Sequence, residues 1–407
     1  MTIATDILKQ MPVVRQPQRK FLNVLFATIL ALRGRVTGRN LSRYCAYSER
    51  TIARQFRASF EWPEFHQRVM TTVLEPCAEL ISVQDASFIP KSGKQTCGLG
   101  QFFNGCANRA ERGLEISTLA VVDVTRRCAF TLAVAQTPPG KVNAKKDRRV
   151  EETRMDFYKQ QLHDQYHRLP SAIRYHCVDG YFAKQKYIDE VVALKLHPIT
   201  KLRHDANCLF LYPGPHPTRR GRRRKYDGKV NFQDLHRFDA LGTLEEKPHL
   251  HLYTAVVWHV SLKRSLRVVV LVNRKEAAKP RLGVLASTDV ALDGHKLVAY
   301  YIARFQIEFL FRDSKQFTGL TDCQSRAETV LDFHFNAALA TLNLARAEEL
   351  QVQTKPSPHV FSMASWKQRH FNERLLDVFI ENLALDPIWV KNHPGYEELK
   401  TYGAIAA

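Results

Sequence analysis

The chain has 407 residues, of which 45% are apolar and 10% aromatic. This length exceeds one ordinary core, so we expect two or three folded domains, and the composition excludes long disorder. Lysine and arginine number 60 against 40 aspartates and glutamates, a formal net charge of +20. Such an excess favours a polyanionic partner, because each neutralised phosphate releases condensed counterions. Ribosomal and membrane-surface proteins share this charge, so it does not identify a nucleic acid by itself.

Targeting and redox signals are weak. The first residues, MTIATDILKQMPVVRQ, lack a signal-peptide core, and no uncharged apolar run reaches 18 residues. We therefore expect a cytoplasmic protein without a membrane partner. The eight cysteines form no C-x-x-C pair, and we interpret them as buried thiols in a reducing cytosol.

Residues 1–76 read as a helical domain. In NLSRYCAYSERTIARQF the pattern predicts a short helix from Leu41, a break near Tyr47 and Ser48, and a second helix carrying Arg50 and Arg54. A short helix, a tight turn and an arginine-rich second helix indicate a helix-turn-helix, whose second helix enters a DNA major groove. The alternative is a plain helical hairpin with a solvated basic face.

Residues 77–199 are predicted to be rich in strands. Residues 81–89, 114–124 and 128–136 predict three strands, a basic loop-and-helix stretch follows over 141–166, and IRYHCVDGYF predicts another strand ended by Gly180. Three consecutive strands, a helix and a further strand give an α/β order with a mixed sheet.

Residues 200–297 form a second β-rich block, with a hairpin predicted around Lys263 and Arg264. Inside it lies a run of basic residues from Arg219 to Lys225 that includes Arg222, Arg223 and Arg224. Such a run is usually a solvated loop, and here it is also a candidate grip on a DNA backbone, as are Lys91 and Lys94 in an earlier loop. Helices are expected over 298–350, and a helical region over 351–407.

The sharpest local signal is in YIARFQIEFLFRDSKQF, residues 301–317. The spacing Y-x2-R-x3-E-x6-K is formed by Tyr301, Arg304, Glu308 and Lys315. At about 100° per residue these positions fall within roughly 60° of one another on one helix. The other positions are mostly apolar, which predicts a helix buried nearly all round whose charges need partners. A metal ion with a phosphate would supply them; an internal ion-pair ladder such as Arg304 with Glu308 is the alternative.

Two aspartates are placed on strands among apolar neighbours. Asp85 shares a strand face with Ile81 and Val83, and Asp179 follows Tyr175 and Cys177 in the same two-residue rhythm. Acids at such positions are costly unless a cation or donor compensates them, although either one alone is more often a turn or cap residue. Three carboxylates, Asp85, Asp179 and Glu308, can bind two Mg²⁺ ions, which is the chemistry of phosphodiester transfer.

Other catalytic signatures fail. Gly93 and Lys94 lack the rest of a phosphate-binding loop, and no G-x-S-x-G nucleophile elbow is present. His249 and His251 alternate on a strand without a third zinc ligand at a suitable spacing, so we interpret them as strand-face residues.

These segments resemble the DDE transposases of bacterial insertion sequences, in the "insertion sequence four" branch. Tyr301, Arg304, Glu308 and Lys315 match that branch's Y-x2-R-x3-E-x6-K motif without a gap. QDASFIPKSGK and VDGYFAK resemble the segments around the family's two catalytic aspartates and point to Asp85 and Asp179. FSMASWKQRHFNE in the tail resembles members more loosely.

The resemblance implies an RNase H-like core, split by a β-rich insertion between the second aspartate and the glutamate. It implies cut-and-paste transposition with two Mg²⁺ ions, or Mn²⁺ in their place, held by Asp85, Asp179 and Glu308. Tyr301, Arg304 and Lys315 would contact DNA phosphates near the cleaved bond. The implied partners are the terminal inverted repeats and target DNA, with a homodimer in the synaptic complex, near the nucleoid of a bacterial cytoplasm.

Two other functions fit parts of the pattern. An inactive DNA-binding regulator derived from a transposase would share the basic surface and the helix-turn-helix, yet it would not need all three acids. An RNase H-like structure-specific endonuclease would keep the acids, but the β-rich block at 200–297 favours a transposase.

Overall fold

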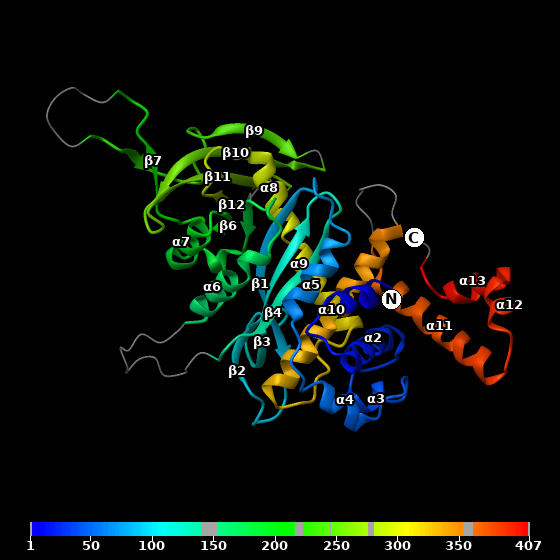
Figure 1. Ribbon diagram of the computed structural model, residues 1–407. Coiled ribbons are helices and arrows are strands. Elements are labelled where there is room, and N and C mark those ends of the chain that lie inside the picture. Colours follow the sequence, from blue (N-terminus) through cyan, green and yellow to red (C-terminus); the bar gives the residue numbers. More distant parts are fainter. Residues whose placement is uncertain are drawn as a thin grey trace. The chain divides into compact units, whose positions relative to one another are not determined.

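A computed structural model gives the structure of the protein over residues 2–139, 153–215, 223–244, 246–275, 281–352 and 361–405. The chain divides into two compact units (Figure 1). The first unit comprises Met1–Ala78, Ala86–Arg149 and Ile307–Ala407; the second comprises Glu79–Asp85 and Val150–Gln306. Strand β1 (Leu80–Pro90) is common to both, because the division falls between Asp85 and Ala86.

The first unit is mainly helical. Its helices are α1 (Thr2–Gln10), α2 (Gln16–Ala31), α3 (Gly38–Leu41), α4 (Glu49–Gln55), α5 (Trp62–Thr71), α9 (Gln306–Phe317, from Ile307), α10 (Glu328–Val352), α11 (Met363–Asn382), α12 (Pro387–Asn392) and α13 (Pro394–Thr401). Its strands are the end of β1, β2 (Gly100–Asn104), β3 (Arg109–Asp123) and β4 (Cys128–Gln136). Strand β3 pairs antiparallel with β2 and β4, and Gly113 lets it approach Phe88 and Ile89 of β1, whose atoms a Cβ would meet at 2.5–2.7 Å.

The long helix α10 seals the open edge of β4. Asn343 accepts a hydrogen bond from the Thr131 amide at 3.0 Å and donates to the Thr131 carbonyl at 2.8 Å. Arg346 donates to the Ala129 carbonyl at 2.6 Å. An edge strand exposes unpaired backbone groups, and buried ones are costly. Two polar side chains of this buried helix therefore take the place of a neighbouring strand.

The second unit is an α/β layer with a β-rich extension. Its strands are the start of β1, β5 (Tyr175–Cys177), β6 (His197–Leu202), β7 (Cys208–Leu211), β8 (Tyr226–Lys229), β9 (Asp239–Leu244), β10 (Lys247–His259), β11 (Arg264–Asn273) and β12 (Arg281–Ser287). Its helices are α6 (Arg154–Gln165), α7 (Gln185–Ala193) and α8 (Gly294–Ala303), with short 3-10 turns η1 (Tyr166–Arg168) and η2 (Gly180–Phe182). The strand order is β1-β5-β6-β12-β11-β10-β7-β8, with β9 on β10.

Helices cover both faces of the parallel strands β1, β5 and β6. On one face the Tyr175 ring of β5 lies 5.0 Å from the Tyr300 ring of α8. On the other face the next residue, His176, is hydrogen-bonded to Tyr187 of α7. A strand covered on both sides has no polar face, which explains why Ser82 and Gln84 of β1 are as fully buried as Ile81 and Val83.

The antiparallel strands carry a core of their own. Valines at alternate positions of β11, Val268, Val270 and Val272, are buried, as the two-residue period of a strand requires. They pack in one cluster with Phe210 of β7 and Phe232 of the loop before β9. This cluster lets the β-rich block fold as more than a surface loop.

The predicted fold class is confirmed: a mixed α/β protein with a β-rich block and helical regions at both ends. The hairpin at Lys263 is confirmed, with that residue in the left-handed region at φ 52°. Two local predictions are wrong. The helix predicted to start at Leu41 ends there, and the strand predicted up to Gly180 ends at Cys177.

The eight cysteines are free thiols, but the expectation that all are buried is wrong, since Cys77, Cys97 and Cys106 are exposed. In the described part of the chain, no helix combines the length and hydrophobicity that crossing a membrane requires.

Candidate active site

The two predicted aspartates of the second unit follow the pairing of β1 with β5. Ser82 pairs with His176 and Val83 with Cys177 in parallel. Asp85 and Asp179 each follow two residues after this last pair, Asp85 within β1 and Asp179 just beyond β5. The parallel pairing therefore brings both segments to the same end of the two strands, and Tyr301 interacts electrostatically with both carboxylates.

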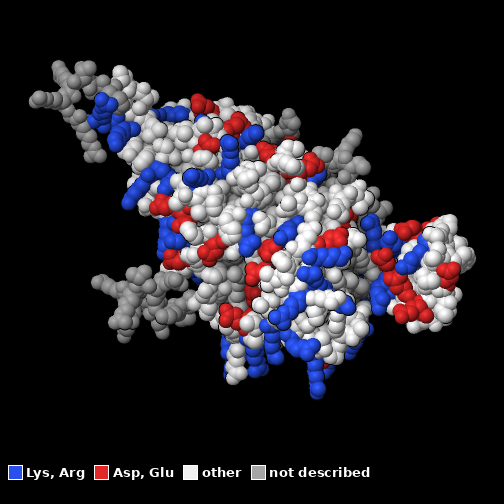
Figure 2. Space-filling model, viewed as in Figure 1, with Lys and Arg blue, Asp and Glu red and all other residues white. Residues whose placement is uncertain are grey.

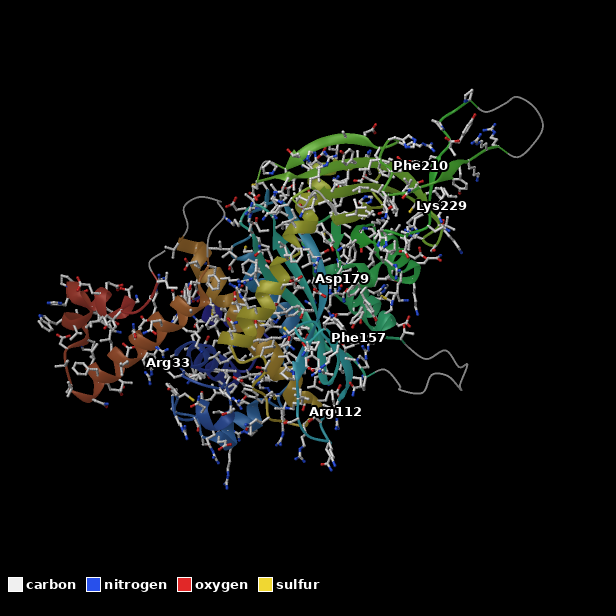
Figure 3. The ribbon with its side chains drawn as sticks, turned by 180° about the vertical axis from the view of Figure 1, so that it is seen from behind. Arg33, Arg112, Phe157, Asp179, Phe210 and Lys229 are labelled. Atoms are coloured by element: carbon white, nitrogen blue, oxygen red, sulfur yellow. The ribbon has the colours of Figure 1, made fainter. Side chains whose placement is uncertain are left out.

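Asp179 lies just past the end of β5 (Figure 3). Its Oδ1 accepts a hydrogen bond from the Tyr181 amide at 2.9 Å, which caps the turn η2. Its own carbonyl accepts from the Thr200 hydroxyl of β6 at 2.8 Å. Gly180 follows so closely against the Lys201 carbonyl that an added Cβ would lie 3.0 Å from it. The Asp179 backbone is thus held against β6 while its carboxylate remains partly exposed.

Asp85 is paired with a buried cation. Nη1 of Arg304 lies 3.2 Å from Oδ2 of Asp85, and the exposed fractions of the two side chains are 5% and 19%. The Arg304 guanidinium also lies over the rings of Tyr301 and Phe305, at 5.4 and 4.7 Å from their centroids. A desolvated pair of this kind is strong locally because water screens it poorly.

The pKa of the Tyr301 hydroxyl depends on both aspartates. Burial raises the pKa of its hydroxyl, and the negative charges of Asp179 and Asp85 act in the same direction, while Arg304 opposes them. The second unit therefore brings four predicted residues together: Asp85, Asp179, Tyr301 and Arg304.

Glu308 and Lys315 lie on α9 in the first unit. The single helix predicted for the motif is wrong, because α8 ends at Ala303 and α9 begins at Gln306. The predicted burial on all sides is also wrong: Ile302, Phe305 and Phe309 are 44%, 43% and 42% exposed. The segment is thus amphipathic, and Glu308 and Arg312 of α9 are exposed together with Phe309.

Lys315 is a half-buried ammonium. Burial lowers its pKa. Among the described residues no hydrogen bond or ion pair to its ammonium is present, so its donors can bind an anion.

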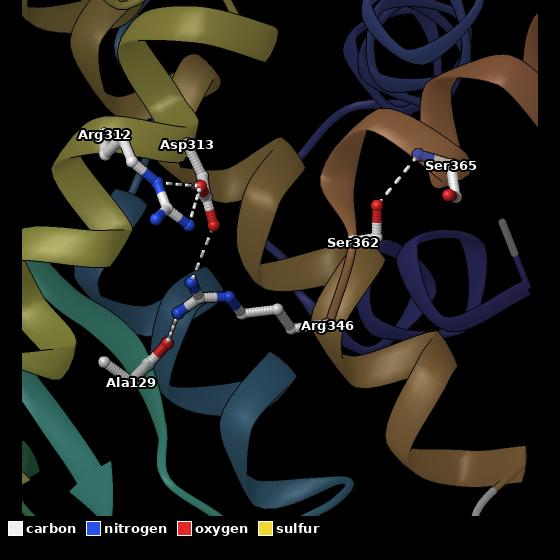
Figure 4. A network of polar contacts seen from close by, with 6 residues as sticks. All are labelled: Ala129, Arg312, Asp313, Arg346, Ser362 and Ser365. Atoms are coloured by element: carbon white, nitrogen blue, oxygen red, sulfur yellow. Dashed lines mark hydrogen bonds and ion pairs between the residues drawn. The ribbon is translucent and has the colours of Figure 1, made fainter. Parts of the chain in front are cut away.

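A buried ion network fixes α9 (Figure 4). Asp313, on the inner side of the helix, accepts from Arg312 at 2.9 Å and from Arg346 of α10 at 3.3 Å. Arg346 is the side chain that also donates to the edge of β4. Because removing one partner of a buried ion pair typically costs about 3–5 kcal/mol, this network ties the orientation of α9 to the β4 edge.

The remaining predicted DNA contacts are distributed over both units. Arg50 and Arg54 are exposed on α4, whose N-cap Ser48 accepts from the Thr51 amide, as expected. Figure 2 shows basic side chains projecting where Figure 1 labels α3 and α4. Lys94 is exposed, whereas Lys91 donates to the Cys323 carbonyl.

In the basic run, Arg222 lies outside the described residues. Arg223 is exposed. Arg224 pairs with Asp227 and lies 4.8 Å from the Tyr212 ring centroid, so its guanidinium is held in place beside an aromatic ring.

The chemistry of the aspartate pair fits a divalent cation. Carboxylate oxygens are the ligands that Mg²⁺ prefers, and here one comes from β1 and the other from the turn that follows the adjacent strand β5. Within the described ranges, no group of three or more histidine, cysteine, aspartate or glutamate side chains forms a ready-made metal site.

One family of known proteins matches the sequence: the family described as DDE superfamily endonuclease, over residues 8–264. The chain belongs to the DDE superfamily of endonucleases. The match includes Asp85 and Asp179 and ends before Glu308. No curated protein matches the sequence. Membership indicates a nuclease-type enzyme acting on DNA, and the mixed sheet is consistent with the RNase H-like core expected for a DDE endonuclease.

Several residues that organise the region escaped sequence analysis. Asn343 and Arg346 stand in the mostly apolar stretch from Ala337 to Ala347 of α10, and this is the signal that the sequence offers; Asp313 stands among other charged residues of α9 and gives none. Buried polar residues in apolar helices require specific partners. Their partners are more than 30 residues distant in the chain, so sequence spacing could not supply them.

Lys367 gives a test of how α9 is held. This α11 lysine donates to the Ile29 carbonyl of α2 and the Phe317 carbonyl of α9, at 2.9 and 2.8 Å. Burial lowers its pKa to about 8, and Arg33 acts in the same direction. A neutral amine still has two hydrogens for these two carbonyls.

We expect the free energy of unfolding of the wild type, relative to Lys367→Met, to rise between pH 8 and 10. In that window the unfolded chain, whose lysine has a pKa near 10.5, binds more protons than the folded chain, so stability increases with pH. Urea denaturation at a series of pH values measures it. A difference independent of pH would contradict the lowered pKa.

Proposed function

We propose that this chain is a transposase of the "insertion sequence four" branch that catalyses cut-and-paste transposition of an insertion sequence. The observation that carries the proposal is the parallel pairing of β1 with β5, after which Asp85 and Asp179 both come within electrostatic reach of Tyr301. The family membership supports cleavage of DNA, and the Y-x2-R-x3-E-x6-K spacing supports the branch.

In this proposal Asp85, Asp179 and Glu308 hold two Mg²⁺ ions, for which Mn²⁺ can substitute. Bound there, the ions would activate a water or a 3′-hydroxyl and stabilise the leaving oxygen. The carboxylates set their position, and the turn at Asp179 fixes one of these carboxylates through the Tyr181 amide.

The cationic residues of the motif would bind the DNA backbone. The Lys315 ammonium is partly desolvated, and a phosphate would repay that cost because charge-assisted hydrogen bonds are strong when water is excluded. Arg304 and Tyr301 adjoin the aspartates, where the phosphate to be cleaved must lie. Lys91, Lys94 and Arg222 to Arg224 would extend the contacts along the strand.

Dimerisation is proposed to use an apolar stripe of α11 and the turn after it. Leu375, Phe379 and Leu383 recur every four residues and are 53–56% exposed, and Ile388 and Trp389 follow at 74% and 69%. Residues four apart lie on one side of a helix, so the stripe is continuous. Exposed patches of this kind mark protein interfaces, and a second copy in the synaptic complex is the partner we propose.

Replacement of the acids tests the chemistry. Asp85→Asn, Asp179→Asn and Glu308→Gln should each reduce Mg²⁺-dependent nicking of DNA carrying the element's ends by at least about a thousandfold, because the neutral amides lose the charge that holds the ions. Binding of the ends, measured by gel shift, should persist. Asp289→Asn is the matched control, since the Asp289 carboxylate accepts from the Tyr175 hydroxyl at 2.8 Å and the Ala291 amide at 3.0 Å and holds no ion in this proposal.

The same assay distinguishes a transposase from an enzyme that only hydrolyses DNA. With pre-cleaved ends, a transposase joins the 3′-hydroxyl to a target plasmid. Cleavage without joining would favour the structure-specific endonuclease. Binding without either reaction would favour the inactive regulator, and full nicking by all three acid variants would remove the assignment.

Arg50 and Arg54 test the DNA-binding helix. The double change to alanine should weaken end binding and make the salt dependence shallower, by about 0.9 in the slope of log K against log salt for each lost phosphate contact. Fluorescence anisotropy over a salt series measures both. Lys9→Ala with Lys20→Ala, which removes the same charge from exposed positions of α1 and α2, should change the slope less; equal effects would mean that only net charge matters.

Substitution of the stripe tests assembly. Phe379→Glu with Leu383→Glu should leave the protein folded but convert its end-bound complex from two copies to one, because charges cannot be buried unpaired in an apolar interface. Analytical ultracentrifugation of the DNA complex gives the stoichiometry. Val352→Glu, at a position 82% exposed on α10, is the control, and a two-copy complex of the stripe variant would exclude this interface.

A further inference from the structure

Behind the aspartates, on the opposite face of β1 and β5, lies a continuous chain of buried polar side chains. Ser82 and Nδ1 of His176 are 2.8 Å apart, and Nε2 of His176 lies 2.8 Å from the Tyr187 hydroxyl. That hydroxyl donates to Oε1 of Gln84 at 2.5 Å. The Gln84 amide in turn donates to Gln161 at 2.9 Å. All five side chains are buried in the second unit.

The direction of every hydrogen bond in this chain is fixed by one backbone carbonyl. Nε2 of Gln84 donates to the Tyr158 carbonyl at 3.1 Å, which can only accept. Oε1 must therefore accept from Tyr187, whose oxygen is then left to accept from His176. Burial lowers the pKa of His176 to about 3, so the ring is neutral and its other nitrogen is an acceptor. The single hydroxyl hydrogen of Ser82 lies between two acceptors, this nitrogen at 2.8 Å and the Tyr175 carbonyl at 3.3 Å.

The chain joins the two strands at the level of the aspartates. Ser82 and Gln84 belong to β1, His176 belongs to β5, and Tyr187 of α7 bridges them. Gln84 immediately precedes Asp85, and His176 lies three residues before Asp179. A slip of one residue between the strands would turn each side chain to the other face. It would leave buried donors and acceptors unpaired, at a cost of about 1–3 kcal/mol each.

We propose that the Ser82–His176–Tyr187–Gln84–Gln161 chain is a positioning network that locks the register of β1 and β5 and thereby sets the spacing of the Asp85 and Asp179 carboxylates for divalent cations. This inference rests on the proposed function. Its residues do not touch the ions; they act through the strand backbone that carries the two ligands.

The Tyr187 hydroxyl is the link to remove, because it joins Gln84 of β1 to His176 of β5 through helix α7. Tyr187→Phe keeps the ring, which packs 5.0 Å from the Phe182 ring. It leaves Oε1 of Gln84 and Nε2 of His176 without this partner. The two strands then lose their hydrogen-bonded connection through α7, while the aromatic ring still fills its place in the core.

Direct Mn²⁺ binding to the full-length protein, followed by electron paramagnetic resonance of the free ion, measures the effect without requiring catalysis. Loss of supporting hydrogen bonds around metal ligands typically lowers metal affinity about 10- to 100-fold, and we expect Tyr187→Phe to fall in that range. Hydrogen exchange should accelerate in β1 and β5. Ser82→Ala, which removes only the end of the chain, should give a smaller loss in the same direction and keeps the test open if Tyr187→Phe does not fold.

Tyr253→Phe is the matched control, because it removes a hydroxyl that accepts from Arg274 at 3.1 Å on β10; its Mn²⁺ affinity should be unchanged. A lower melting temperature for Tyr187→Phe with wild-type Mn²⁺ affinity would overturn the inference and leave the proposed function standing. A wild type that neither binds Mn²⁺ nor nicks DNA would overturn both.

Discussion

The parallel pairing of β1 with β5 is the constraint on which the candidate site depends. A carboxylate on a strand is positioned by the neighbouring strand more than by its own side-chain torsions, because register decides which residues stand opposite each other. Here the pairing is short, with β5 only three residues long. Backbone hydrogen bonds of so short a strand contribute little, so side chains must supply the remaining specificity. The buried polar chain behind the strands and the Thr200 bond to Asp179 supply it.

The same principle organises α9 in the first unit. Glu308 is on a helix that presents Phe309 to solvent, so apolar packing fixes only part of its surface. Asp313 and Arg346 fix the rest, and Lys367 holds the helix end. Buried charges are expensive and contribute little net stability compared with an apolar pair. These charges instead fix the orientation of the helix. A bridging ion pair forms in one orientation, whereas an apolar contact can form in many.

Local patterns in the sequence predicted much of the fold. The strands at Leu80–Pro90 and Cys128–Gln136 and the hairpin at Lys263 were recovered from alternation and turn chemistry. The break between α8 and α9 and the exposure of this segment are not predicted by its sequence, because its many apolar residues favour one helix that is buried on all sides. Exposure depends on what covers a helix, and Phe305 and Phe309 show that an apolar residue beside a functional motif need not be core. The aspartates were identified as candidates, but their proximity depends on pairing between segments more than 90 residues apart, which periodicity does not encode.

The sealing of β4 has a consequence for how this protein can self-associate. The amide and carbonyl of Thr131 and the carbonyl of Ala129 are already hydrogen-bonded to side chains of α10. A strand from another molecule therefore cannot pair with β4 at these positions. Runaway stacking of the kind that leads to fibres is blocked there. At β4, contacts between copies would therefore have to use side chains and could not use backbone pairing.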